Sequence, residues 1–268
     1  ISGVNVDELA KYWPQSLGSD TQQWVVANMS DGLIHEVQAE TRLRWTEGQS
    51  LELLTVDGSL VADNLTISYM DQMPKVRGVK SHMKFNEEVF EAFVTSGKSG
   101  DLAIKRGRIR ITGLDEFDQY ANIDLSIAGS VGSKLTYIDH PPFGFAAGIG
   151  IDPKNVADSA TTKLKLQFIL EHTLTADQID VSAQSTLRDV SVANIFLGHG
   201  IHGSKLSLKV DRERMTMTGD VFIGKIPARL SWRENFGPKA EFRSRYDLSA
   251  TISDVQHLSD LGLDLDLF

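Results

Sequence analysis

One stretch of the chain resembles a site for binding phosphates. Ala92 is followed after four residues by Gly97-Lys98-Ser99, which is a loosened form of the phosphate-binding loop. That loop works by presenting backbone N–H groups to phosphates at the start of a helix, whereas residues Asp101–Ile111 alternate like a strand. We therefore expect a hairpin turn at Gly97 to Gly100 and no nucleotide site.

Two histidines stand close enough in sequence to begin a metal site. His199 and His202 are three residues apart in a glycine-rich stretch, and imidazole is a common metal ligand. Further histidines or carboxylates must complete such a site, but the nearest acids, Asp189 and Asp211, stand at no suggestive spacing. We expect a surface loop here, and we predict neither a metal nor a cofactor for the chain.

The sequence offers weak candidates for hydrolytic chemistry. A serine nucleophile on a strained turn would show the pattern Gly-x-Ser-x-Gly, and the serines beside glycines, Ser99 and Ser130, lack that spacing. Asp115, Glu116 and Asp118 could supply a general acid and base, but acids beside glycine are typical of a solvated turn. We predict no catalytic residue and no enzyme, with an unrecognised hydrolase as the least favoured hypothesis.

Most of the chain alternates between apolar and polar residues with a period of two, which is typical of strands with one apolar face. Glycine, Asp or Asn usually separates the alternating runs, which favours tight turns. At least ten such runs predict a mainly β chain with a meandering antiparallel sheet and a few short helices. The apolar-face positions of these runs include Ile123, Leu125, Ile127, Leu164, Leu166, Phe168, Leu206 and Leu208.

Signals for helices are few. Val6–Tyr12 is a short candidate, and Ser19 begins a capping box that opens a helix ending at Gly32. Pro153–Asp158 and Asp254–Leu261 are the other short candidates.

Length, composition and charge bound the class of protein. The chain has 268 residues, with 27 Lys and Arg against 36 Asp and Glu, so its net charge is −9. This acidic balance argues against a nucleic-acid partner, and the absence of cysteine excludes disulfides and thiol chemistry. The prolines after His140 favour a boundary between an N-terminal segment of helices and sheet, 1–140, and a continuing sheet segment, 141–268. One continuous domain cut from a longer protein is the alternative.

Several segments resemble a known group of bacterial envelope proteins. They are Tyr12-Trp13-Pro14, Trp24–Asn28, Ile67–Pro74, Met217–Ala228 and Trp232–Phe236. The group is the AsmA-like superfamily, in particular its YhdP-type branch, and the resemblance covers nearly the whole chain. Because these motifs are turns and strand edges, they identify no active site.

The resemblance implies a location and a partner. It implies a periplasmic protein anchored in the inner membrane through a segment absent from this chain. It also implies a long curled antiparallel sheet, forming a groove or an incomplete barrel-like structure, that carries phospholipid or another acyl lipid toward the outer membrane. The apolar-face positions named above are then the candidates to line this groove. The residues alone leave a dry core and an open groove equally favoured, because period-two alternation is the same for both. A structural module that scaffolds envelope partners through its sheet edges is the alternative function.

Overall fold

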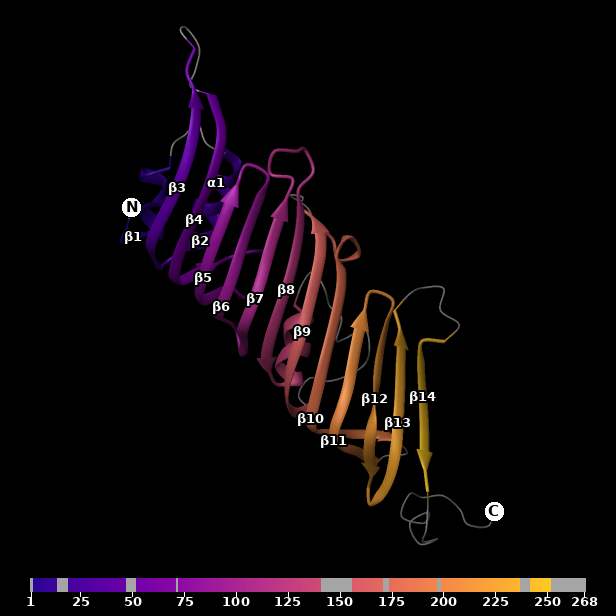
Figure 1. Ribbon diagram of the computed structural model, residues 1–268. Coiled ribbons are helices and arrows are strands. Elements are labelled where there is room, and N and C mark those ends of the chain that lie inside the picture. Colours follow the sequence, from indigo (N-terminus) through magenta and orange to yellow (C-terminus); the bar gives the residue numbers. More distant parts are fainter. Residues whose placement is uncertain are drawn as a thin grey trace, which may run out of the picture. The chain divides into compact units, whose positions relative to one another are not determined.

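The protein is mainly β. The computed structural model describes residues 2–13, 19–46, 52–70, 72–140, 156–170, 174–196, 199–236 and 242–251. Its strands form one 14-stranded sheet with the order β1-β3-β4-β5-β6-β7-β8-β9-β10-β11-β12-β13-β14, and β2 pairs with β4 off this path (Figure 1). The strand order follows the chain and does not close on itself. The expectation of a mainly β chain with an open antiparallel sheet and short helices is therefore confirmed.

Most of the strands are seven residues or longer, and β1 and β2 have two residues each. The strands are β1 Val4–Asn5, β2 Met29–Ser30, β3 Leu33–Arg44, β4 Glu52–Ile67, β5 Val76–Asn86, β6 Val89–Ser99, β7 Leu102–Thr112, β8 Tyr120–Gly129, β9 Val156–Ile169, β10 Asp180–Phe196, β11 His199–Asp211, β12 Arg214–Ile223, β13 Ile226–Asn235 and β14 Ser244–Ala250. The helical elements in the described residues are η1 Val6–Lys11, α1 Ser19–Asn28, α2 Val131–Ile138 and η3 Ala176–Gln178. Among them, none is long and apolar enough to cross a bilayer.

The chain divides into two compact units. The N-terminal unit comprises Ile1–Ile127 and Lys165–Ile179, and the C-terminal unit comprises Ala128–Leu164 and Asp180–Phe268. The predicted boundary after His140 falls beside residues 141–155, which lie outside the described residues, so it stays a prediction.

The core of the N-terminal unit lies on one face of its strands. Met83 on β5 is opposite Leu60 on one neighbouring strand and Ala92 on the other, so these three side chains share that face. Ile34 and Leu65 extend the same core, and the short elements β1 and η1 contribute to it. The remaining buried members are Val4, Val6, Ala62, Val79 and Val94.

In the C-terminal unit, buried and exposed residues alternate along the strands more regularly than in the N-terminal unit. On β13, Ile226, Ala228, Leu230 and Trp232 are buried, while the residues between them are more exposed. Val131 of α2 packs against this core. The strands β12 and β13 therefore each present an apolar face to the core and a polar face to solvent.

Glycines let neighbouring strands accept large side chains. Gly58 is opposite Phe85, and a Cβ atom at Gly58 would meet the Phe85 ring. Gly219 is opposite Leu206, and a Cβ atom there would lie 2.6 Å from Leu206 Cδ2 and 2.7 Å from the Lys205 carbonyl oxygen. In both pairs the absent side chain makes room for the large residue across the strands.

Some sequence predictions of helices hold and others fail. The predicted helix at Val6–Tyr12 is the 3-10 helix η1, and the helix opened at Ser19 is α1. Helix α1 ends earlier than predicted, at Asn28, because Met29–Ser30 pairs with β4, and Gly32 instead takes a φ of +80° in the following turn. The prediction for Asp254–Leu261 falls outside the described residues.

Two further predictions of local structure are wrong. Residues 156–158 of the predicted helix Pro153–Asp158 belong to β9, which begins at Val156. The predicted loop around His199 and His202 is the start of β11, where His202 pairs with Ser191 and Phe222. The hairpin predicted at Gly97 to Gly100 is present, but its turn lies later than predicted, at Gly100 and Asp101, because Gly97–Ser99 still pair with β7.

Candidate functional site

The eight apolar residues predicted to line a groove lie on three strands. Ile123, Leu125 and Ile127 are on β8, Leu164, Leu166 and Phe168 are on β9, and Leu206 and Leu208 are on β11. They are divided between the two units, because Leu164 and the two residues of β11 belong to the C-terminal unit.

In the N-terminal unit, β8 and β9 turn their apolar side chains to one face. Asp124 and Lys165 form an ion pair at 3.8 Å on the solvent side, so the residues alternating with them face the other way. Leu125 lies against Gly107, and Gly107 is opposite the buried Val94. The apolar face of β8 and β9 is therefore the face that carries the core of this unit.

These side chains are only partly covered. Ile123, Leu125, Ile127, Leu166 and Phe168 all keep some solvent exposure, whereas Leu65 in the centre of the same unit has none. We call these five residues the β8–β9 apolar patch. On β8 only the small side chain of Ala121 is fully buried among the described residues. The patch thus differs from the covered core farther along the same unit.

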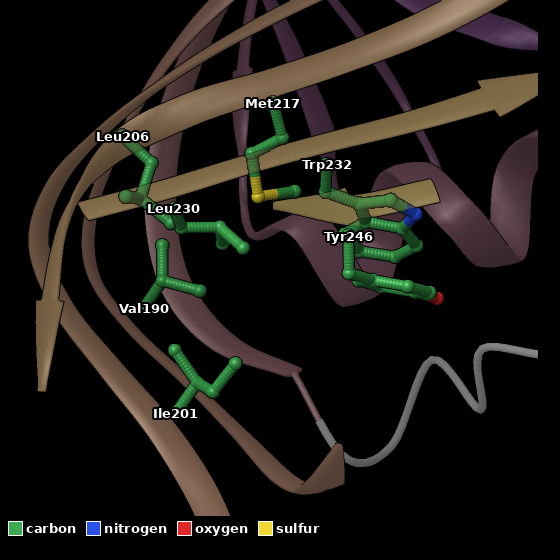
Figure 2. A pocket seen from close by; sticks show the side chains of 7 residues that line it. All are labelled: Val190, Ile201, Leu206, Met217, Leu230, Trp232 and Tyr246. Carbon is green, nitrogen blue, oxygen red and sulfur yellow. The ribbon is translucent and has the colours of Figure 1, made fainter. Parts of the chain in front are cut away.

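The C-terminal unit places its candidate residues in or against a packed core. Leu206 is 2% exposed, and Leu208 is half-buried against the same cluster. Figure 2 shows the side chains around a small cavity on the inner side of the bent strands. The cavity lining consists of Val190, Ile201, Leu206, Met217, Leu230, Trp232 and Tyr246. Its volume is about 20 Å³, which is close to the space that one water molecule needs and far below that of an acyl chain.

A polar cluster that the sequence analysis did not identify lies beside this cavity. Glu234 is 2% exposed, yet its side chain carries a carboxyl group. Trp232 Nε1 donates to Glu234 Oε1 at 2.8 Å, and Ser244 Oγ donates to Glu234 Oε2 at 2.7 Å. Both carboxylate oxygens therefore have donors, as a buried carboxylate requires.

Tyr246 joins this cluster from the neighbouring strand. Its ring stacks on Trp232 with the centroids 5.2 Å apart and an angle of 24° between the planes. Tyr246 is opposite Trp232 in the register of β13 and β14, so the stacking follows from the strand pairing. Burial raises the pKa of the Tyr246 hydroxyl, and the charge of Glu234 and a hydrogen bond to that carboxylate raise it further.

The cluster holds two strands together on their inner face. Glu234 on β13 reaches Ser244 and Tyr246 on β14, while Trp232 belongs to its own strand. Because the carboxylate is sealed from solvent, we interpret the cluster as a clamp between β13 and β14. A signal for it existed in the sequence, since Glu234 occupies an apolar-face position two residues after Trp232.

The described residues contain no group of three or more His, Cys, Asp or Glu side chains that could hold a metal ion. His202 is exposed in β11, and the side chain of His199 lies outside the described residues. No family model, no curated protein and no solved structure matches this chain.

Proposed function

We propose that this chain is a non-enzymatic module of an AsmA-like envelope protein that lines or supports a hydrophobic path for phospholipid. In this proposal the protein is periplasmic and is anchored to the inner membrane through a segment outside the chain. The observation that carries the proposal is the β8–β9 apolar patch, whose large apolar side chains share one face of neighbouring strands and remain partly exposed.

A partly exposed apolar face is stabilised by a ligand that covers it. Partly exposed apolar side chains that adjoin one another are typical of binding surfaces, because leaving them in water is unfavourable. An acyl chain on this patch would gain about 0.8 kcal/mol for each CH₂ group that it buries. The contact needs no specific polar partner, so a lipid tail of varied structure suits it. The small cavity of the C-terminal unit does not offer comparable space.

Lipid bound to the purified chain tests the proposal directly. Native mass spectrometry and lipid extraction would measure phospholipid that co-purifies with the wild-type chain. Leu166→Asp places a charge within the apolar patch, and Gln167→Asp places the same group one residue away on the exposed opposite face of β9. We expect Leu166→Asp to lose the lipid and Gln167→Asp to keep it.

The stability of both variants separates the possible explanations. If Leu166→Asp remains folded by circular dichroism and has lost its lipid, the apolar patch carries the binding. If the folded wild-type chain takes up no lipid from vesicles, or if both variants bind lipid as well as the wild type does, the proposed function is wrong.

A scaffold is the second candidate, and the strand order supports it. β14 stands at one end of that order, so one of its edges pairs with no described strand. The cavity within the core of the C-terminal unit, about 20 Å³, is too small for a lipid tail, which also suits a module that makes contacts rather than holds ligands. This alternative predicts that neighbouring segments of the full-length protein protect β14 amides from hydrogen exchange, with no lipid present.

A further inference from the structure

Basic residues are concentrated in three neighbouring strands of the N-terminal unit. Residues 75–110 contain nine Lys and Arg against four Asp and Glu, a net charge of +5 in a chain whose total is −9. This stretch forms β5, β6 and β7, which pair in that order. The charge is thus gathered on one part of the sheet.

The register places the cations on the face opposite the core. Arg77 is directly opposite Lys98, and both are exposed. Lys98 in turn is opposite Ala103, and Lys105 is the next residue on that side of β7. Farther along, Arg108 and Arg110 are opposite Phe93 and Glu91. We call the exposed residues Arg77, Lys98, Lys105, Arg108 and Arg110 the basic face.

Acidic neighbours neutralise little of this charge. Arg108 pairs with Glu91, donating from Nε at 2.8 Å, and nearby Lys80 pairs with Asp63 at 3.3 Å. For Arg77, Lys98 and Lys105, none of the ion pairs among the described residues involves them. Like charges directly opposite each other on a sheet are destabilising, so the Arg77 and Lys98 pair favours an anionic partner.

We propose that the basic face docks the N-terminal unit onto a bilayer surface that carries anionic lipids. Cations on adjacent extended strands present several charges side by side, and each Lys or Arg near an anionic leaflet strengthens binding through that charge. This interaction concerns the face opposite the β8–β9 apolar patch, so it does not rest on the proposed lipid path.

A nucleic acid is the less favoured polyanion. Proteins that bind nucleic acids are usually basic as a whole, while this chain is acidic. Binding of single strands also needs exposed aromatic rings for bases to stack on. The ring within the basic face, Phe93, is half-buried, and the Arg108 guanidinium lies over it at 5.8 Å from the ring centroid.

Co-sedimentation of the whole chain with vesicles tests the proposal. The probes are phosphatidylcholine vesicles that contain phosphatidylglycerol and vesicles of phosphatidylcholine alone. We expect binding to the first only, decreasing as salt is added. The triple variant Arg77→Gln, Lys98→Gln, Lys105→Gln should bind the anionic vesicles roughly a hundredfold more weakly, since each cation contributes about a fivefold factor.

A matched control removes three exposed cations from the C-terminal unit. Arg188→Gln, Lys205→Gln, Lys209→Gln changes the net charge equally, and Lys205 there stands opposite the acid Asp220. We expect this control to bind vesicles like the wild type. The single variants Arg77→Gln and Lys98→Gln, each expected to weaken binding about fivefold, provide the same test if the triple variant does not fold.

Three results would overturn the proposal. The first is wild-type binding that is equal for both kinds of vesicle or absent from both. The second is an equal loss of binding in the triple variant and the control. The third is binding to a single-stranded RNA oligonucleotide that is as tight as binding to the anionic vesicles and is lost in the same triple variant, which would assign the basic face to nucleic acid.

Discussion

Glu234 is a carboxylate on a face that is otherwise apolar. Its neighbours on the same side of β13, Trp232 and Leu230, are both buried. An ionised group in such surroundings is costly unless donors satisfy it, and here the indole of Trp232 and the hydroxyl of Ser244 do so. Both of these hydrogen bonds in the β13–β14 clamp therefore end on the carboxylate of Glu234.

Removing this carboxylate should destabilise the chain. We expect Glu234→Ala to lower the free energy of unfolding by about 2 kcal/mol, because it leaves the buried Trp232 N–H without an acceptor. Glu234→Gln keeps one acceptor and should cost about half as much. Urea unfolding measures both. The control Glu213→Ala, at an exposed position, should change stability by less than about 0.5 kcal/mol. An equal effect of Glu234→Ala and Glu213→Ala would contradict the clamp.

The same contact makes stability depend on alkaline pH. The folded state raises the pKa of Tyr246 above its ordinary value of 10.0, through burial and through Glu234. The unfolded chain therefore ionises this tyrosine first, so stability is complete below pH 10 and falls as the pH rises through the folded-state pKa. Tyr246→Phe should reduce that alkaline loss, and Glu234→Gln should reduce it in part. Chemical denaturation at several alkaline pH values measures it, and an unchanged profile in Tyr246→Phe would refute this origin.

At the scale of elements, the fit between strands depends on glycine at positions opposite large residues. Gly219→Ala should destabilise the C-terminal unit by about 1–3 kcal/mol, because its Cβ atom would approach both Leu206 and the Lys205 backbone too closely. Gly97→Ala is the control, since its Cβ atom would first meet the flexible Val76 side chain at 3.3 Å. Thermal unfolding measures both variants, and a larger loss for Gly97→Ala would show that this account of strand packing is wrong.

The strands were predictable from sequence because their alternation has a clear period. Helix α2 was not predicted, although Ser130 caps it by accepting a hydrogen bond from Ser133 N at 2.9 Å, because two glycines, Gly129 and Gly132, interrupt the helical signal there. His199 and His202 suggested a loop because of the glycines around them, but pairing with β10 and β12 imposes a strand. Local signals were thus overruled where neighbouring strands supplied hydrogen bonds.

At the scale of the whole molecule, two units with separate cores predict two unfolding transitions. Trp232 is buried in the C-terminal unit, whereas Trp24 and Trp45 belong to the N-terminal unit. Leu230→Ala should lower the unfolding free energy of the C-terminal unit by about 2–5 kcal/mol. The midpoint of the transition that Trp232 reports should therefore fall more than the midpoint of the transition that the N-terminal tryptophans report. Fluorescence of variants that retain one reporter would measure this, and equal shifts in both would indicate one cooperative unit.

The sequence could predict that the groove candidates lie on an apolar face, but not how far each side chain is exposed to solvent. Leu206 and Leu166 follow the same alternation, yet Leu206 is buried and Leu166 keeps some exposure. Leu206 is buried because residues distant in sequence, among them Val131 of α2, pack into its cluster, and no local pattern encodes such contacts. The role of Glu234 was not predicted for a related reason. A buried acid on an apolar face can be recognised as part of a hydrogen-bonded cluster only when its donor on β14, Ser244, is known.

The strand order has a consequence for how such a protein changes in evolution. From β3 to β14, the path of the sheet joins each strand to the strands next to it in sequence, and among the described strands no pair joins the two ends of the path. Duplication or loss of one hairpin would therefore alter the reach of the sheet while leaving distant pairings intact, as in repeat proteins whose units contact only their neighbours. Descendants of one ancestral chain could in this way span gaps of different widths without a redesigned interior.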